Sequence, residues 1–374
     1  MILPGSTLGM LGGGQLGKMF TVAARTMGYR VVVLDPDPRS PAGSIADEHL
    51  CAGFSDPQAL RRMADLCQVV TIEFENIPAQ ALRDLSSEVP VYPSASAVEI
   101  AQNRIREKTY IRKIGLKTAE FAVLEKAGDI DGIDPGFVFP AILKVAEFGY
   151  DGKGQIAVGS LTEVSAAFES LGCVACVLEQ RIDLALEVSV ILARGEGQAP
   201  LAFPVAENEH RAGILHQTMV PASLPAALQQ QAQAQAVKLA EALDYHGVLA
   251  VEFFVTGDGE LLINEMAPRT HNSGHYTLDA CITSQFEQQV RAICGLPFGD
   301  VRLLSPVAMI NLLGDLWADG APDWMQLLSN PAAKLHLYGK HEPRPGRKMG
   351  HFCLLDDSVE VLRQRPEQIF QALT

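Results

Sequence analysis

Long apolar runs are missing from this sequence of 374 residues, and no stretch is long enough to cross a bilayer. The N-terminus also lacks the basic start and apolar stretch of a secretory signal peptide. Basic residues are outnumbered, with 30 lysines and arginines against 44 aspartates and glutamates, so the net charge is −14. Because this charge repels a phosphodiester backbone, we expect no nucleic-acid partner. Without a spanning stretch we expect no membrane partner either.

The sequence contains seven cysteines scattered along the chain. An odd number without regular spacing does not suit a disulfide framework. Cys173 and Cys176 form a CxxC pair, but no second pair with metal-ligand spacing accompanies it. The apolar run at 176–178 predicts instead that the pair packs in the core of a strand. The pattern favours a reducing compartment, and we expect a cytoplasmic protein.

The length and apolar content predict several packed units. A chain of 374 residues is too long for a single hydrophobic core. Hydrophobic residues make up 48% of it, so burial is ample and disorder is not expected. We expect roughly two to four units.

The N-terminal stretch has the pattern of a βαβ unit. Residues 6–11 and 29–34 predict strands, residues 18–27 predict a helix, and the turn at 12–17 matches GxGxxG. Asp35 ends the second strand, as the ribose-binding acid of a dinucleotide fold does. The same turn can equally hold a simple phosphate on backbone N–H groups. Both ligands therefore stay open, and with them a nicotinamide-dependent oxidoreductase.

A further strand at 69–74 continues the parallel sheet and brings three polar residues to its carboxyl end: Glu73, Glu75 and Asn76. Ligands of open parallel sheets bind outside this end. A binding role and a solvated loop are equally compatible with the pattern.

A helix is predicted over 96–114. Ser96 and Glu99 form a capping box at its start, and Gly115 ends it. Three basic residues share one face because they are four positions apart: Arg104, Lys108 and Arg112. Such a stripe is either a solvated face or, in an acidic protein, a surface that meets phosphates.

The β-rich unit that follows contains a lysine inside an apolar strand. Lys144 lies in the predicted strand 140–145, and a glycine loop at 148–155 leads to a second strand at 156–158. A buried lysine requires an anion, and a glycine loop between strands can close over phosphates. The loop is not a Walker A motif, because no hydroxyl follows Lys153. A flexible surface turn is the alternative.

Polar residues flank the next predicted strands. Residues 179–182 end a buried strand at 173–180, and Glu187 opens another at 188–193. Such acids can accept hydrogen bonds from sugar hydroxyls or can face solvent. His210 is expected in a polar loop, where a lone histidine is more often without function.

The central stretch predicts a hairpin that carries two acids. Apolar strands at 248–255 and 260–266 are joined by a glycine-containing turn and interrupted by Glu252 and Glu265. A register counted from the turn places Glu252 opposite Ile263, with the carboxylates as diagonal neighbours roughly 7–8 Å apart. Two ionised carboxylates among apolar residues need a cation, and oxygen ligands alone suit Mg²⁺. A solvated acidic face is the alternative.

Four segments together resemble the ATP-grasp superfamily, in which ATP is clamped between a lid and a core with two magnesium-binding acids. Within it they resemble the 5-(carboxyamino)imidazole ribonucleotide synthase family of purine biosynthesis. The segments are LGGGQLG at 11–17, GYDGKGQ at 149–155, NEMAPRTHNSGH at 264–275 and RPGRKMGH at 344–351. The resemblance covers essentially the whole chain. It implies that the glycine turn holds a ribonucleotide phosphate rather than a dinucleotide.

The resemblance implies a multidomain α/β and α+β protein with the ATP-grasp fold. The expected units are an N-terminal doubly wound βαβ domain at 1–95, a linking helix and small β-rich lid at 96–175, a mixed α+β core at 176–298 and a small C-terminal β-rich unit at 299–374. A homodimer is also expected.

The resemblance also implies a set of site residues. ATP would be held by Arg104, Lys144, Gly149, Tyr150, Asp151, Gly152, Lys153, Gly154, Gln155, Glu179, Gln180, Arg181, Ile182, Glu187, His210, Asn264 and Glu265. Mg²⁺ would bind Glu252 and Glu265. The catalytic residues would be Arg269, His271 and Lys348. The ribonucleotide would contact Gly14, Gln15, Leu16, Glu73, Tyr150, Asp151, Asn272 and Arg347. Many relatives have a basic residue before the glycine loop, where this chain has Ala146 and Glu147, which leaves an extra phosphate contact open.

The implied reaction uses ATP, bicarbonate and 5-aminoimidazole ribonucleotide. Bicarbonate would attack the γ-phosphate to give carboxyphosphate and ADP. The exocyclic amine of the ribonucleotide would then capture carboxyphosphate, or CO₂ released from it. Two alternatives are another purine ATP-grasp enzyme, such as the formate-dependent glycinamide ribonucleotide transformylase, and a nicotinamide-dependent oxidoreductase.

Overall fold

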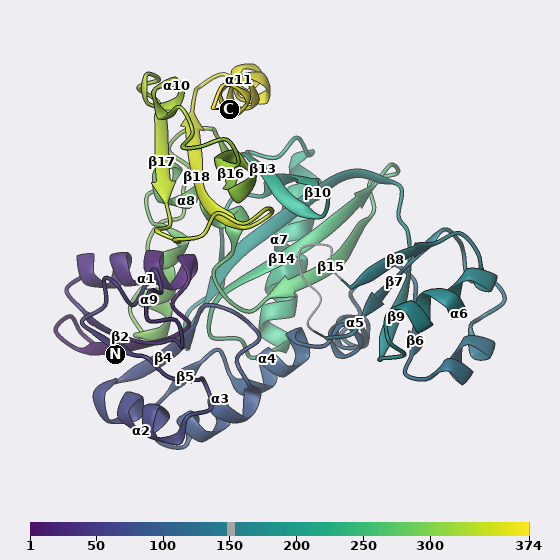
Figure 1. Cartoon of the computed structure of the whole chain (residues 1–374), viewed down its shortest axis with the longest axis horizontal. Helices are drawn as coiled ribbons and strands as arrows, with labels where there is room; N and C mark the ends of the chain where they lie inside the picture. The colour runs from purple at the N-terminus through teal and green to yellow at the C-terminus, as the bar shows by residue number, and fades with distance from the viewer. Residues whose placement is uncertain (148–153, 374) are drawn as a thin grey trace.

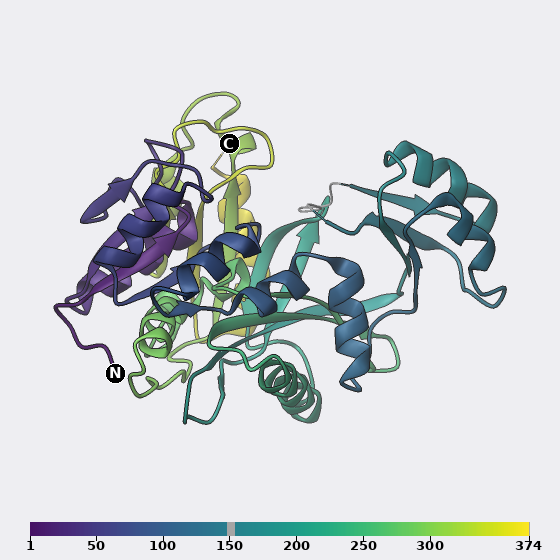
Figure 2. The ribbon, with the colours of Figure 1, turned by 90° about the horizontal axis from the view of Figure 1, so that it is seen from below.

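A computed structural model describes residues 1–147 and 154–373, and within these residues the chain is built on three β-sheets (Figure 1). Two views show the smallest sheet and its helix α6 (Leu161–Ser170) projecting from the rest of the molecule (Figures 1 and 2). Within the described ranges, no helix combines the length and apolarity needed to cross a membrane.

The N-terminal sheet is parallel, and its strand order is β3-β2-β1-β4-β5. Its elements are β1 (Thr7–Leu11), α1 (Gln15–Thr26), β2 (Arg30–Leu34), β3 (Glu48–Leu50), α2 (Pro57–Leu66), β4 (Val69–Ile72), α3 (Ala79–Ser86) and β5 (Val91–Tyr92). Helices cover both faces, α1 and α9 (Gln285–Ile293) on one and α2 and α3 on the other. The predicted doubly wound βαβ domain is thus confirmed. Its first helix begins three residues earlier than predicted.

The small sheet is antiparallel, in the order β6-β9-β7-β8. Its strands are β6 (Phe121–Leu124), β7 (Ala141–Val145), β8 (Gln155–Val158) and β9 (Cys176–Gln180), with the short helix η1 (Ala127–Gly132). Cys176 is buried in this sheet, as predicted for the CxxC pair. The same prediction is wrong for Cys173, which is exposed because it lies in the turn before β9, with a φ of 55°.

The large sheet has nine strands in the order β15-β14-β10-β12-β13-β16-β18-β17, with β11 paired to β10. The strands are β10 (Leu184–Arg194), β11 (Leu201–Ala202), β12 (Ala206–Arg211), β13 (Ile214–Val220), β14 (Gly247–Thr256), β15 (Leu261–Ala267), β16 (Val307–Leu313), β17 (Ala333–Leu337) and β18 (Lys348–Leu355). The C-terminal strands therefore extend the same sheet as the predicted core. The exact division into four units stays a prediction.

Helices cover the large sheet and its ends (Figure 1). They are α7 (Ala226–Ala242), η2 (Asn272–Gly274), α8 (Thr277–Ala280), η3 (Gly314–Trp317), α10 (Trp324–Leu328) and α11 (Val359–Gln371). Val251 and Phe253 of β14 point into the core beneath α7. Because side chains alternate along a strand, Glu252 and Phe254 point to the opposite face, where they line a cavity.

The single helix predicted over 96–114 is wrong, because the chain forms two helices there. They are α4 (Ala95–Ala101) and α5 (Arg104–Lys113). The side chain of Asn103 accepts hydrogen bonds from the backbone N–H groups of Ile105 and Arg106 and so starts α5. This break places Arg104 in the first turn of a new helix.

The predicted capping box of Ser96 and Glu99 is also wrong. Ser94 caps α4 by accepting a hydrogen bond from Ala97 N. Glu99 instead pairs with Arg83 of α3, at 2.7 Å. Serines two positions apart offer the same capping group, so the local pattern did not decide between them.

One carboxylate ties the C-terminal helix α11 to the large sheet. Glu367 lies 2.8 Å from His216 Nε2 of β13 and 3.1 Å from Arg211 Nη1 of β12. Burial raises the pKa of Glu367, but hydrogen bonds from Arg211, His216 and Gln371 outweigh it and lower the pKa to about 2.

We expect Glu367→Gln to lower the free energy of unfolding by roughly 1–2 kcal/mol near pH 6. Since the folded-state pKa of about 2 lies below the ordinary 4.5, this difference is present above pH 4.5 and fades as the pH falls through about 2. Urea unfolding of both proteins between pH 6 and pH 2 measures it. Glu360→Gln, on the exposed first turn of α11, is the control. A difference that is unchanged at pH 2 would contradict the prediction.

Candidate active site

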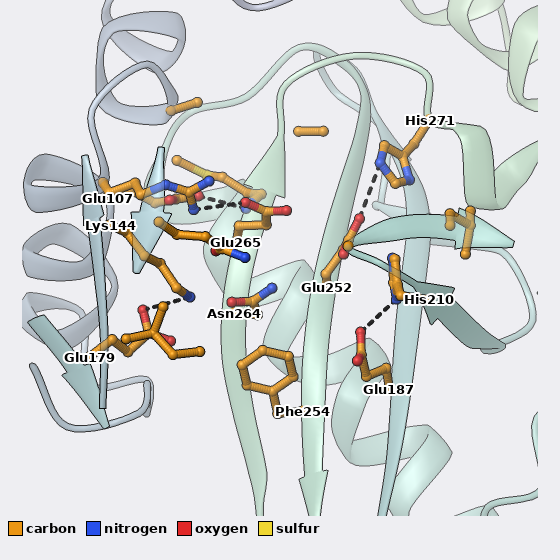
Figure 3. A pocket seen from close by; sticks show the side chains of 18 of the residues that line it. Glu107, Lys144, Glu179, Glu187, His210, Glu252, Phe254, Asn264, Glu265 and His271 are labelled. Atoms are coloured by element: carbon orange, nitrogen blue, oxygen red, sulfur yellow. Dashed lines mark hydrogen bonds and ion pairs between the residues drawn. The ribbon is translucent and has the colours of Figure 1, made fainter. Parts of the chain in front are cut away.

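A cavity of about 640 Å³ is lined by the three units that the sheets define (Figure 3). Sixteen of the site residues expected from the sequence line it: Arg104, Lys144, Gln155, Glu179, Gln180, Arg181, Ile182, Glu187, His210, Glu252, Asn264, Glu265, Arg269, His271, Asn272 and Lys348. They come from α5, the small sheet and the large sheet. These sixteen residues lie up to 244 positions apart in the sequence, from Arg104 to Lys348.

The remaining predicted residues do not line this cavity in the described part of the chain. Gly149, Tyr150, Asp151, Gly152 and Lys153 lie outside the described residues. Gly154, Gly14, Gln15, Leu16, Glu73 and Arg347 lie elsewhere. Arg347 donates from Nη1 to Glu342 O at 2.9 Å.

The glycine turn before α1 directs its backbone N–H groups to a side chain. Gly17 N donates to Glu73 Oε2 at 2.7 Å, and Gly14 N donates to Glu73 Oε1. Gly13 N donates to Asp35 Oδ2 at 2.7 Å. Glu73, at the end of β4, therefore occupies the N-terminus of α1 where the sequence predicts a phosphate. A phosphate at this turn has to compete with that carboxylate.

Glu252 and Glu265 lie directly opposite each other on β14 and β15. The predicted diagonal register is wrong, because a β-bulge lies between Glu252 and Phe253 and leaves Asn264 as the extra residue. Burial, and then the facing Glu265, raise the pKa of Glu252 to about 7. Burial also raises the pKa of Glu265, but Arg104 and Lys144 outweigh it and lower that pKa.

The bulge provides a third oxygen that suits a divalent cation. Asn264 Oδ1 is buried and has no hydrogen-bond partner among the described residues. With the carboxylates of Glu252 and Glu265 it forms an all-oxygen set, which is the chemistry that Mg²⁺ prefers. No group of three or more His, Cys, Asp or Glu side chains in the described ranges is arranged for a metal. An ion here would therefore complete its coordination with ligand or water oxygens.

Basic residues face the acids from α5 and the small sheet (Figure 3). Arg104 Nη1 donates to Glu265 Oε2 at 3.0 Å. Lys144 Nζ lies 3.3 Å from Glu179 Oε2, which confirms that the buried lysine has an anionic partner. Lys108 is fully buried and Arg112 stacks over the Phe121 ring at 4.3 Å, so the solvated-face alternative for the basic stripe is wrong.

Sequence reasoning missed two charged residues of α5 that are buried beside the cavity. Lys108 appeared only as one member of a basic stripe. Glu107, which lines the cavity, accepts a hydrogen bond from Met266 N at 2.6 Å, and burial raises its pKa to about 8. Both residues lie within one helical turn of Arg104 in the sequence, and this spacing could have placed them near the same site.

A histidine and a glutamate face each other on β12 and β10. His210 Nδ1 lies 2.7 Å from Glu187 Oε2. The predicted polar loop for His210 is wrong, because the residue lies in β12. Burial opposes its charge, yet the hydrogen bond to Glu187 and the nearby carboxylate of Glu252 raise the pKa of His210.

Arg269 and His271 follow β15 and point into the same cavity. Arg269 forms a two-pronged ion pair with Glu75, with Nη2 3.0 Å from Oε1. Glu75, which the sequence left open, thus has a defined partner. His271 Nε2 lies 3.1 Å from Glu252 Oε1, and Nδ1 lies 2.9 Å from Ser273 Oγ. Burial and then the cation of Arg269 hold the pKa of His271 well below 6.5.

Glu147, which precedes the glycine loop, contacts the start of α5. Asn103 Nδ2 donates to its Oε1 at 2.9 Å, and Arg104 N donates to Ala146 O at 2.9 Å. These two hydrogen bonds connect the end of β7 in the small sheet to the start of α5.

Three protein families match consecutive parts of the chain. Residues 5–102 match the ribonucleotide synthetase preATP-grasp domain, residues 109–286 match the ATP-grasp domain, and residues 307–365 match the phosphoribosylaminoimidazole carboxylase C-terminal domain. The N5-carboxyaminoimidazole ribonucleotide synthase of Bacillus subtilis is 43% identical over 376 residues, covering 100% of this chain and 96% of that protein. The synthase of Brucella melitensis is 43% identical, covering 93% and 96%.

Solved structures show the same likeness. An ADP complex of an N5-carboxyaminoimidazole ribonucleotide synthetase is 42% identical with a TM-score of 0.93, covering 99% of this chain and 97% of that one. The Aspergillus clavatus synthase in complex with ADP and 5-aminoimidazole ribonucleotide is 32% identical with a TM-score of 0.90, covering 98% of each chain.

We expect millimolar Mg²⁺ to raise the melting temperature of the wild-type protein by a few degrees, because it relieves the repulsion between Glu252 and Glu265. Glu252→Gln removes that repulsion, so the variant melts at an equal or higher temperature without metal and no longer responds to Mg²⁺. Asp258→Asn, in the exposed turn of the same hairpin, is the control. A full Mg²⁺ response in Glu252→Gln would show that the ion binds elsewhere.

Proposed function

The chain belongs to the N5-carboxyaminoimidazole ribonucleotide synthase family, and we propose how its cavity serves that family's reaction. It is an ATP-grasp ligase that carboxylates 5-aminoimidazole ribonucleotide at the expense of ATP in purine biosynthesis. The whole-chain match excludes the two alternatives that the sequence left open. One observation carries the residue-level proposal: the opposed carboxylates and the cations Arg104, Lys144 and Arg269 line a single cavity.

ATP binds, in this proposal, between the small sheet and β14–β15. Arg104 and Lys144 would hold the phosphates, because charge neutralisation and positioning dominate phosphoryl transfer. The apolar side chains of Ile142, Ile182 and Phe254 line the cavity and suit the adenine ring. Glu187 would accept hydrogen bonds from ribose hydroxyls beside His210. Contacts from residues 149–153 rest on the sequence motif alone.

Mg²⁺ would be held by Glu252, Glu265 and Asn264 Oδ1, the three oxygen-bearing side chains that the bulge brings together. Bound there, it would supply positive charge to the terminal phosphates. Arg104 Nη1 lies 3.0 Å from Glu265 Oε2 and offsets part of its charge. This ion pair therefore holds the Glu265 carboxylate in position for the metal.

Arg269 is proposed to bind bicarbonate. Its guanidinium already holds the planar carboxylate of Glu75 with two hydrogen bonds, and bicarbonate offers the same flat pair of oxygens. The attack of bicarbonate on the γ-phosphate and the later attack of the amine on the carboxyl carbon each release one proton. His271, whose ring lines the cavity beside Glu252, is proposed to accept such a proton.

The ribonucleotide would contact Asn272 and Lys348, which line the same cavity as Arg269. Its proposed contacts with Gly14, Gln15, Leu16, Glu73 and Arg347 require the ligand to reach outside this cavity. A homodimer and a cytoplasmic location also stay proposals. The free thiols of all seven cysteines agree with a reducing compartment.

The decisive experiment is an ADP-release assay in which each substrate is omitted in turn. We expect ADP release to require 5-aminoimidazole ribonucleotide and bicarbonate together, with the carboxylated ribonucleotide as product. Formate with glycinamide ribonucleotide should release no ADP, and NADH should not bind. ADP release driven by formate but not by bicarbonate would overturn the proposal.

We expect Lys348→Ala to raise KM for the ribonucleotide by roughly 10- to 100-fold, the effect of one charge-assisted hydrogen bond. KM for ATP should stay within about threefold, because in this proposal Arg104 and Lys144, rather than Lys348, hold the phosphates of ATP. Lys334→Ala, on the exposed side of the neighbouring strand β17, is the matched control. A loss of ATP affinity alone would contradict the assignment.

A further inference from the structure

One carboxylate oxygen joins two lysines at the edge of the cavity. Lys108 Nζ lies 2.8 Å and Lys144 Nζ lies 3.3 Å from Glu179 Oε2. The side chains of Lys108 and Glu179 are 0% and 3% exposed. Figure 3 shows the pair formed by Lys144 and Glu179. Because two cations share one buried anion, one of them can leave while the anion keeps a partner.

The two lysines differ in what else they reach. Lys144, on β7, lines the cavity, whereas Lys108, on α5, is not among its described lining residues. The ammonium of Lys108 also donates to Asn264 O at 3.2 Å. Lys108 therefore contacts a strand of the small sheet and a strand of the large sheet at once. It is held by two buried groups, while Lys144 faces the ligand space.

We propose that Lys108 is a positioning residue for nucleotide binding, which keeps Glu179 paired when Lys144 moves from that carboxylate to the phosphates of ATP. The inference rests on the proposed function, because ATP is the anion that Lys144 takes in exchange. Without Lys108, this movement leaves a buried carboxylate with no counter-ion, which is strongly unfavourable. Lys144 then stays on Glu179 and binds the phosphates weakly.

The charge state of Lys144 agrees with this exchange. Burial lowers the pKa of Lys144, and the nearby cation of Lys108 lowers it further, whereas Glu179 raises it. An adjacent anion therefore favours the charged form of Lys144 in both states. The carboxylate supplies that anion before the nucleotide binds, and a phosphate supplies it afterwards.

The test compares Lys108→Met, Glu179→Gln and the double variant with the wild type. Lys113→Met, which removes an exposed lysine from the same helix, is the matched control. ADP release gives KM for ATP, KM for the ribonucleotide and kcat. Calorimetry gives the Kd of Mg²⁺-ADP without turnover, and thermal unfolding reports stability.

We expect Lys108→Met to raise KM for ATP and Kd for ADP about tenfold or more, with KM for the ribonucleotide changed less than threefold. Adding Glu179→Gln should restore nucleotide affinity to within about threefold of Glu179→Gln alone, because a neutral amide no longer retains Lys144. Lys113→Met should match the wild type. This rescue distinguishes the exchange from a purely structural role, which the second substitution does not correct.

Two results would overturn the inference. One is a folded Lys108→Met protein whose nucleotide affinity is within about threefold of wild type. The other is a tenfold difference in nucleotide affinity between Glu179→Gln and the double variant, which remains measurable even if Lys108→Met alone fails to fold. A wild-type protein without bicarbonate-dependent ADP release would overturn the proposed function, and ADP calorimetry on the variants would still test Lys108 separately.

Discussion

Two carboxylates that face each other across neighbouring strands are the constraint around which this protein is arranged. Glu252 and Glu265 lie directly opposite each other, and Glu265 helps to raise the pKa of Glu252, so the pair needs positive charge nearby for both carboxylates to stay ionised. Helix α5 supplies part of this positive charge. It begins after Asn103, and Arg104 in its first turn pairs with Glu265. The broken helix and the bulged hairpin are therefore two parts of one electrostatic arrangement.

The small sheet extends this arrangement across the cavity. On strands β7 and β9, Lys144 Nζ lies 3.3 Å from Glu179 Oε2. Lys108 of α5 contacts the same carboxylate oxygen. Charged side chains of the small sheet and α5 thus border the cavity on this side. Charged contacts of this kind can exchange partners when a polyanion enters, whereas a packed apolar interface would resist opening.

Sequence reasoning reached the elements and the site but not the details that depend on tertiary contacts. The hairpin, the acids on one face of it and the buried Lys144 all follow from periodicity and from the cost of burying charge. The bulge at Asn264 did not, because a register counted from the turn assumes an uninterrupted ladder. The break at Asn103 and the capping of α1 by Glu73 were also missed. The contact of Glu73 with α1 joins residues that are distant in sequence. The capping of α5 by Asn103 competes with the continuation of the helix that the same local pattern allows.

The pairs in the cavity also explain how a chain with a net charge of −14 can bind ATP and bicarbonate. Before a ligand arrives, Arg269 holds Glu75 and Lys144 holds Glu179, so the cations are already desolvated and oriented by carboxylates. A phosphate or bicarbonate oxygen that replaces such a carboxylate meets a cation whose dehydration has already been offset by folding. The displaced acid must then find another partner, which Lys108 provides for Glu179. Glu75 and Glu179 therefore occupy the anion-binding positions until the substrates replace them. The cavity can thus bind anions although the chain as a whole is negatively charged.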